Sequence, residues 1–128
     1  MKSLNKTNSN IEPKVGMLAT MRVGGDRYAM VIVRVLTKNR IICFNLYDLD
    51  NADIKTINGI QYYNKDVERI YYKNTLHLSN DQDMYNDFIN EHTYTKRHNG
   101  TWREINHGIH DGCSLVLGVG ENYFDPDF

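Results

Sequence analysis

The chain contains little proline, cysteine or alanine and has no excess of charge of either sign. It has two Pro, two Cys and three Ala among 128 residues, and its 15 basic and 16 acidic side chains give a formal net charge of −1. This balance excludes the strongly basic surface of a sequence-independent nucleic-acid binder and the acidity of a DNA mimic. Bulk charge therefore disfavours nucleic acid as a partner, and binding of single-stranded nucleic acid by a small barrel stays open as a third hypothesis.

Long apolar runs are also missing from the chain. No uninterrupted apolar stretch is longer than a strand, which excludes a membrane-spanning helix of about 20 residues. Residues 1–13 are polar and lysine-containing, without the apolar centre of a secretory signal. We expect a disordered leader over 1–13, a single β-rich domain over 14–128, no membrane partner and an intracellular location.

Sequence motifs of the common catalytic sites are absent. The chain has no phosphate-binding loop, dinucleotide fingerprint, zinc-protease helix or nucleophile elbow, so we expect no enzymatic activity and no cofactor. His107 and His110 have a spacing that a metal can use, but no third ligand is evident and no metal site is predicted. Cys43 and Cys113 are predicted to be buried, reduced thiols, and a disulfide between them stays open.

Alternating apolar residues predict a mainly β fold. Apolar or aromatic residues recur at every second position on both sides of Gly24-Gly25-Asp26, which is typical of a hairpin. We expect further strands at 40–46, 60–63, 67–73, 93–98, 101–106 and 113–119, a surface excursion at 47–58, and one weak helix candidate at 79–91. This order favours a small antiparallel barrel or curled sheet with at most one short helix.

The hairpin around Asn99-Gly100 supplies the first candidate binding residues. A two-residue turn would place Arg97 opposite Trp102 and Lys96 opposite Arg103. Arg97 could cover the indole, or the two side chains could sandwich a base. Lys96 and Arg103 would either hold an anion between them or extend separately into water, and both interpretations stay open.

The first hairpin supplies a second candidate group. Arg22 and Arg27 flank Gly24-Gly25-Asp26 and could hold a phosphate, although a local bond between Asp26 and Arg27 is the simpler alternative. Tyrosines can stack on bases, but packing within a sheet explains most of them equally well. The candidate ligand-binding residues are Arg22, Arg27, Tyr28, Lys96, Arg97, Trp102, Arg103 and Tyr123.

Blocks at both ends of the chain resemble one family of proteins. They are Val15-Gly16-Met17 with Ala19-Thr20 and Asp26-Arg27-Tyr28-Ala29, the segment 95–102, Leu115-Val116-Leu117-Gly118, and the aromatic terminus 123–128. Together they resemble a family of small proteins encoded by tailed bacteriophages, over about residues 15–35 and 93–128. The resemblance is thin between residues 47 and 91.

The resemblance implies a bacteriophage protein that acts in the host cytoplasm. Phage proteins of this size often counter host defence, either by binding a defence protein or by sequestering its nucleotide messenger. We expect immune evasion by a homo-oligomer that binds a cyclic nucleotide or cyclic ADP-ribose-type messenger without turnover. The alternative is a small β-barrel module that inhibits a host defence protein or assembles with phage proteins.

Overall fold

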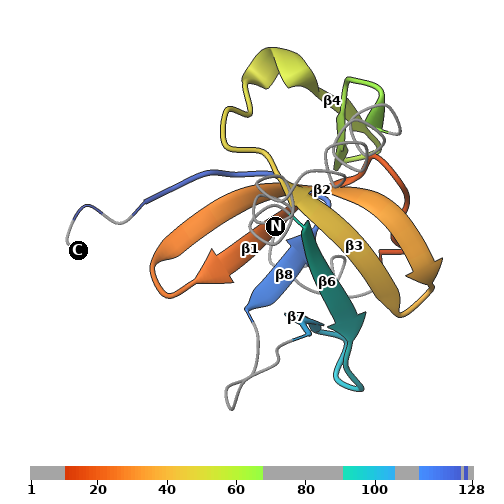
Figure 1. Cartoon of the computed structure of the whole chain (residues 1–128). Helices are drawn as coiled ribbons and strands as arrows, with labels where there is room; N and C mark the ends of the chain where they lie inside the picture. Colours follow the sequence, from red (N-terminus) through yellow and green to blue (C-terminus); the bar gives the residue numbers. More distant parts are fainter. Residues whose placement is uncertain (1–10, 68–90, 106–112, 125, 127–128) are drawn as a thin grey trace, which may run out of the picture.

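The protein is mainly β and forms a closed antiparallel barrel, as the sequence predicts (Figure 1). The computed structural model describes residues 11–67, 91–105, 113–124 and 126. Within them the barrel consists of β1 (Leu18–Val23), β2 (Asp26–Thr37), β3 (Arg40–Asn45), β6 (Glu91–Lys96), β7 (Trp102–Glu104) and β8 (Ser114–Leu117). The strands follow one another in chain order, and pairing of β1 with β8 closes the barrel.

Alternate residues of each strand fill the barrel interior. The interior side chains near β1 are Met17, Ala19 and Met21, of which Met17 directly precedes the strand. On β2 they are Met30 and Ile32, so the predicted two-residue period is confirmed. The other buried members of this core are Ile11, Ile41, Cys43, Tyr94, Trp102, Leu115 and Leu117. Because neighbouring residues of a strand point to opposite faces, the residues between these lie on the outer wall.

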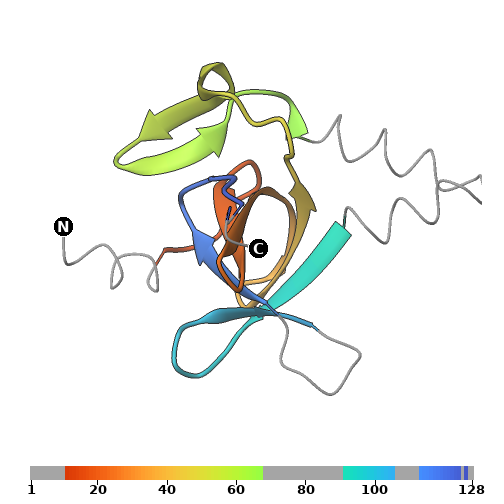
Figure 2. The same cartoon turned by 90° about the vertical axis from the view of Figure 1, so that its left-hand side faces the viewer.

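A two-stranded sheet covers part of the outer wall. Strands β4 (Ile54–Ile57) and β5 (Ile60–Tyr63) lie outside the barrel in both views (Figures 1 and 2). Ile54 and Tyr63 pack on a second apolar cluster formed by Leu18, Val31, Val33, Ile42, Phe44 and Val67. The expected surface excursion at 47–58 is therefore wrong in its second half, where β4 follows a short 3-10 helix over Asn51–Asp53.

Several expected elements fall wholly or mostly outside the described residues. These are positions 1–10 of the leader, 68–73 of one strand candidate and 79–90 of the helix candidate. Ile11 is 8% exposed and belongs to the interior core, and Pro13 is buried. Among the described residues, no helix has the length and apolarity needed to cross a bilayer.

The hairpin of β6 and β7 differs from the expected one by a single residue of register. Lys96 pairs with Trp102, Thr95 with Arg103 and Tyr94 with Glu104. In the turn, Gly100 donates its N–H to the Arg97 carbonyl at 2.9 Å and has a φ of +87°. A type I turn followed by a left-handed glycine has this pattern, whereas the type I′ turn expected for Asn-Gly would need positive φ at both of its residues. A shift of one residue exchanges the faces of every side chain on one strand relative to the other.

Candidate functional site

The corrected register removes the two pairs expected in the second hairpin. Trp102 is 2% exposed and lies in the barrel interior beside Tyr94, so it is not available to stack on a base. It pairs with Lys96 rather than with Arg97, and Arg103 lies on the outer wall opposite Thr95. Lys96 and Arg103 therefore belong to different faces, and Arg97 lies exposed at the loop.

The first hairpin does bring its two arginines together. Arg22 and Arg27 are direct partners across β1 and β2, and both are exposed on the outer wall. The N–H and C=O of Arg27 both bond to Tyr123 on the other side, at 2.7 and 2.9 Å. The Arg22–Arg27 pair is therefore the close, non-hydrogen-bonded kind, with Cα atoms about 4.5 Å apart.

Tyr123 extends this pair on the same face. It forms an isolated antiparallel bridge with Arg27, and directly opposed residues point to the same side of a sheet. The Tyr123 side chain is 49% exposed. Tyr28, by contrast, is the inward neighbour of Arg27, packs against the interior core, and meets the Phe124 ring edge-on at 5.3 Å between centroids. Of the two candidate tyrosines, only Tyr123 faces the arginines.

A small pocket lies between the two arginines and the chain after β8. Its volume is about 180 Å³, and it is lined by Thr20, Arg22, Arg27, Val116, Val119 and Glu121. Small-molecule sites are commonly about 300–1,000 Å³. The pocket is therefore large enough for a phosphate-sized group and too small for a whole nucleotide.

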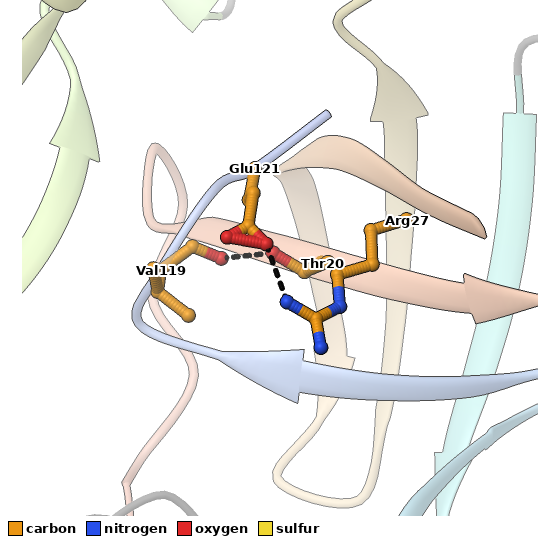
Figure 3. Close-up of polar contacts among 4 residues, drawn as sticks. All are labelled: Thr20, Arg27, Val119 and Glu121. Carbon is orange, nitrogen blue, oxygen red and sulfur yellow. Dashed lines mark hydrogen bonds and ion pairs between the residues drawn. The ribbon is translucent and has the colours of Figure 1, made fainter. Parts of the chain in front are cut away.

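One carboxylate already contacts this pocket. The Arg27 guanidinium donates to Glu121 Oε1 at 2.7 Å, and both side chains are 44% exposed (Figure 3). Next to it the Thr20 hydroxyl donates to the Val119 carbonyl at 2.7 Å and fixes the pocket wall. Exposed ion pairs contribute about 0–1 kcal/mol, so a competing anion can displace Glu121 at small cost.

Loop contacts hold the segment that carries Glu121 and Tyr123. Asn122 Oδ1 accepts from the Ala29 N–H at 2.8 Å, and Asn122 Nδ2 donates to the Leu46 carbonyl at 2.8 Å. Gly120 donates to Gln61 Oε1 at 2.9 Å. These bonds anchor the C-terminal segment on β2, on the chain after β3 and on the two-stranded sheet. Sequence reasoning found Tyr123 but missed Glu121, because no local pattern predicts which strand a terminal segment will bond.

A second polar group lies at the barrel interior, on the wall formed by β3, β6 and β7. His92 Nδ1 and Glu104 Oε2 are 2.6 Å apart, and His92 Nε2 and Asn45 Oδ1 are 2.9 Å apart. Both ring nitrogens are thus engaged, which suits a structural role better than that of a base. The described residues contain no group of three His, Cys, Asp or Glu able to hold a metal, and His107 and His110 lie outside them.

The class of structure is therefore a six-stranded antiparallel barrel with an arginine-lined pocket on its outer wall. No protein-family model, curated protein or solved structure matches the chain.

Proposed function

We propose that this protein binds a phosphate-bearing nucleotide on its outer wall and holds it without turnover. The observation that carries the proposal is the direct opposition of Arg22 and Arg27. Like charges facing each other across a sheet are destabilising, and an anion between them offsets that cost. Glu121 neutralises part of the pair from the side of Arg27. Guanidinium groups also match phosphate geometry through paired N–H donors.

The position of Tyr123 makes a nucleotide a better fit than inorganic phosphate. A phosphate in the pocket would leave the base outside it, because the volume of about 180 Å³ holds no more than the charged group. Tyr123 lies next to Arg27 with half of its side chain exposed, so it can offer a ring to that base. Base–aromatic stacking contributes about 1–3 kcal/mol per base.

The resemblance to tailed-phage proteins suggests the biological use of such a site. A phage protein that sequesters a cyclic nucleotide or cyclic ADP-ribose-type messenger would silence host defence from the host cytoplasm. Depleting a messenger at micromolar levels requires a binding free energy of about −8 kcal/mol or better. Charge-assisted phosphate contacts and a stacked base both contribute to that amount. Assembly as a homo-oligomer stays a prediction.

Calorimetry against cyclic dinucleotides, cyclic trinucleotides and ADP-ribose isomers tests this proposal. We expect one class to bind, and the double variant Arg22→Gln plus Arg27→Gln to weaken its binding at least tenfold. Glu121→Gln should strengthen binding several-fold, because it removes the carboxylate that competes for Arg27. Lys14→Gln plus Lys55→Gln is the charge-matched control, since both lysines are exposed and neither lines this pocket. Binding of no ligand, or equal binding by the arginine double variant, contradicts the proposal.

Exposed aromatic side chains favour a second function, inhibition of a host protein by direct binding. Tyr47 is 53% exposed and Phe124 is 56% exposed, and Asn122 connects their segments through its bond to the Tyr47 carbonyl. Exposed aromatic groups of this kind are enriched at protein interfaces. In this case a host protein should co-purify with the chain, Phe124→Ser should abolish the association, and the arginine double variant should leave it intact.

A further inference from the structure

The two arginines of the proposed site are the beginning of a longer row on the outer wall. Arg22 pairs with Ser114, Ser114 with Arg103, Arg103 with Thr95, and Thr95 with Arg40. Residues that are directly opposed in a sheet share a face, so all of these side chains leave the same surface of the barrel. We define the arginine row as Tyr123, Arg27, Arg22, Ser114, Arg103, Thr95 and Arg40.

The residues next to the row along each strand confirm that the row lies on the outer wall of the barrel. The residues that adjoin the row along β1, β8, β7, β6 and β3 are buried in the barrel core, namely Met21, Leu115, Trp102, Tyr94 and Ile41. The row itself contains four arginines, and the Glu121 carboxylate contacts it at Arg27. The net charge of −1 therefore conceals a line of positive groups that crosses the barrel wall.

The far end of the row opens into a second pocket. This pocket has a volume of about 420 Å³ and is lined by Leu36, Thr37, Asn39, Arg40, Thr95 and Lys96. Arg40 and Lys96 both line this pocket, although Lys96 pairs with Trp102 and is not a member of the row. One end of the row thus has a pocket with Arg22 and Arg27, and the other has a pocket with Arg40 and Lys96.

The distance between the two ends of the row limits which ligands can contact both pockets at once. From Arg27 to Arg40 the row crosses five strand-to-strand steps, and neighbouring strands lie about 4.8 Å apart, which gives a path of about 24 Å. The strands of a barrel are tilted, so the row runs obliquely and reaches β2 again at Thr37 instead of closing at Arg27. A mononucleotide or cyclic dinucleotide is too short for this path.

We infer that the site extends along the arginine row and also takes a short single-stranded oligonucleotide, whose phosphates follow the row from Arg27 to Arg40. This inference rests on the proposed function, because the row begins at the same Arg22–Arg27 pair. At about 3.4 Å per stacked nucleotide, the path of about 24 Å corresponds to about seven nucleotides. Small barrels bind about 4–16 nucleotides of a single strand with a basic groove and stacking aromatics. Tyr123 provides the aromatic group at one end of the row.

Fluorescence anisotropy with labelled oligothymidylates tests this inference. The series runs from the dinucleotide to about twelve nucleotides, and a cyclic dinucleotide is measured beside it. We expect the affinity to rise with length and to level off near seven nucleotides. Arg40→Gln plus Lys96→Gln should weaken binding of the longer strands at least tenfold and leave the dinucleotide unaffected. For every phosphate that a variant no longer neutralises, the slope of log affinity against log salt should become shallower by about 0.7.

The variants distinguish failure of this inference from failure of the proposed function. If the dinucleotide or cyclic dinucleotide binds as tightly as the long strands, or if Arg40→Gln plus Lys96→Gln changes nothing, the oligonucleotide inference is overturned and the proposed function stands. If no nucleotide of any length binds, both are overturned. Lys14→Gln plus Lys55→Gln controls for the removal of two charges, and the melting temperature of each variant verifies that it folds.

Discussion

Burial determines the chemistry of single residues inside the barrel. Cys43 and Tyr94 are fully buried, and loss of solvation raises the pKa of both side chains well above their ordinary values of 9.0 and 10.0. Burial also raises the pKa of Cys113, which is partly exposed. Both cysteines are free thiols. Because the thiolate is the reactive form, Cys43 is expected to be inert toward thiol reagents in the native state.

These raised pKa values give stability a defined dependence on pH. A raised native pKa means that the folded state keeps a proton which the unfolded state loses, so stability is complete below the unfolded pKa and falls above it. The free energy of unfolding should therefore decrease above pH 9.0, with a slope approaching about 1.4 kcal/mol per pH unit for each proton retained. Urea titrations between neutral and alkaline pH measure it.

Cys43→Ala separates this effect from general alkaline unfolding. The variant should be less stable at neutral pH because it leaves a small cavity, but its stability should decrease more slowly just above pH 9.0. Parallel decreases in both proteins would show that Cys43 makes no contribution to the pH dependence.

At the scale of elements, the same dipeptide forms two different turns. Asn58-Gly59 joins β4 to β5, and both residues have positive φ, at +53° and +80°, as a two-residue type I′ turn requires. At Asn99-Gly100 only the glycine has a positive φ. There Asn99 Oδ1 accepts from the Thr101 N–H at 3.1 Å and from the Thr101 hydroxyl at 2.7 Å. The side chain of Asn99 thus stabilises the longer loop.

Substitution of Gly100 tests the proposed conformation of this loop. Left-handed backbone costs an L-residue about 1–2 kcal/mol, so Gly100→Ala should lower the free energy of unfolding by about that amount. Gly25 is a suitable control, because it lies in the turn between β1 and β2 without a positive φ. Denaturant titration measures both variants, and equal decreases in the two would contradict the loop conformation.

The local pattern of the sequence predicts the strands better than it predicts their register. Alternation identifies the inward faces of β1, β2 and β3, because burial on one side imposes a period of two. The register of β7 depends instead on whether the loop after Lys96 follows a two-residue or a longer turn, and that one-residue difference reverses the face on which Trp102 lies. The partners of the candidate site, such as Glu121 beside Arg27, depend on contacts between distant residues.

At the scale of the whole molecule, closure of the barrel arranges residues that are far apart in the sequence. Arg27, Arg103 and Arg40 belong to three different strands and become one row only because β8 pairs with β1 and β7. Counting charges over the chain therefore underestimates the local potential that a ligand meets. The binding site is a property of the closed barrel, and partial unfolding of β8 should abolish it.

An NMR titration is the most direct measurement of oligonucleotide binding along the arginine row. It follows the arginine side-chain Nε–Hε signals while an oligothymidylate of about seven nucleotides is added. We expect shifts at Arg22, Arg27 and Arg40, together with ring signals of Tyr123, and no change for Trp102 in the interior. Shifts confined to residues of the two-stranded sheet, or an unchanged spectrum at saturating ligand, would contradict it.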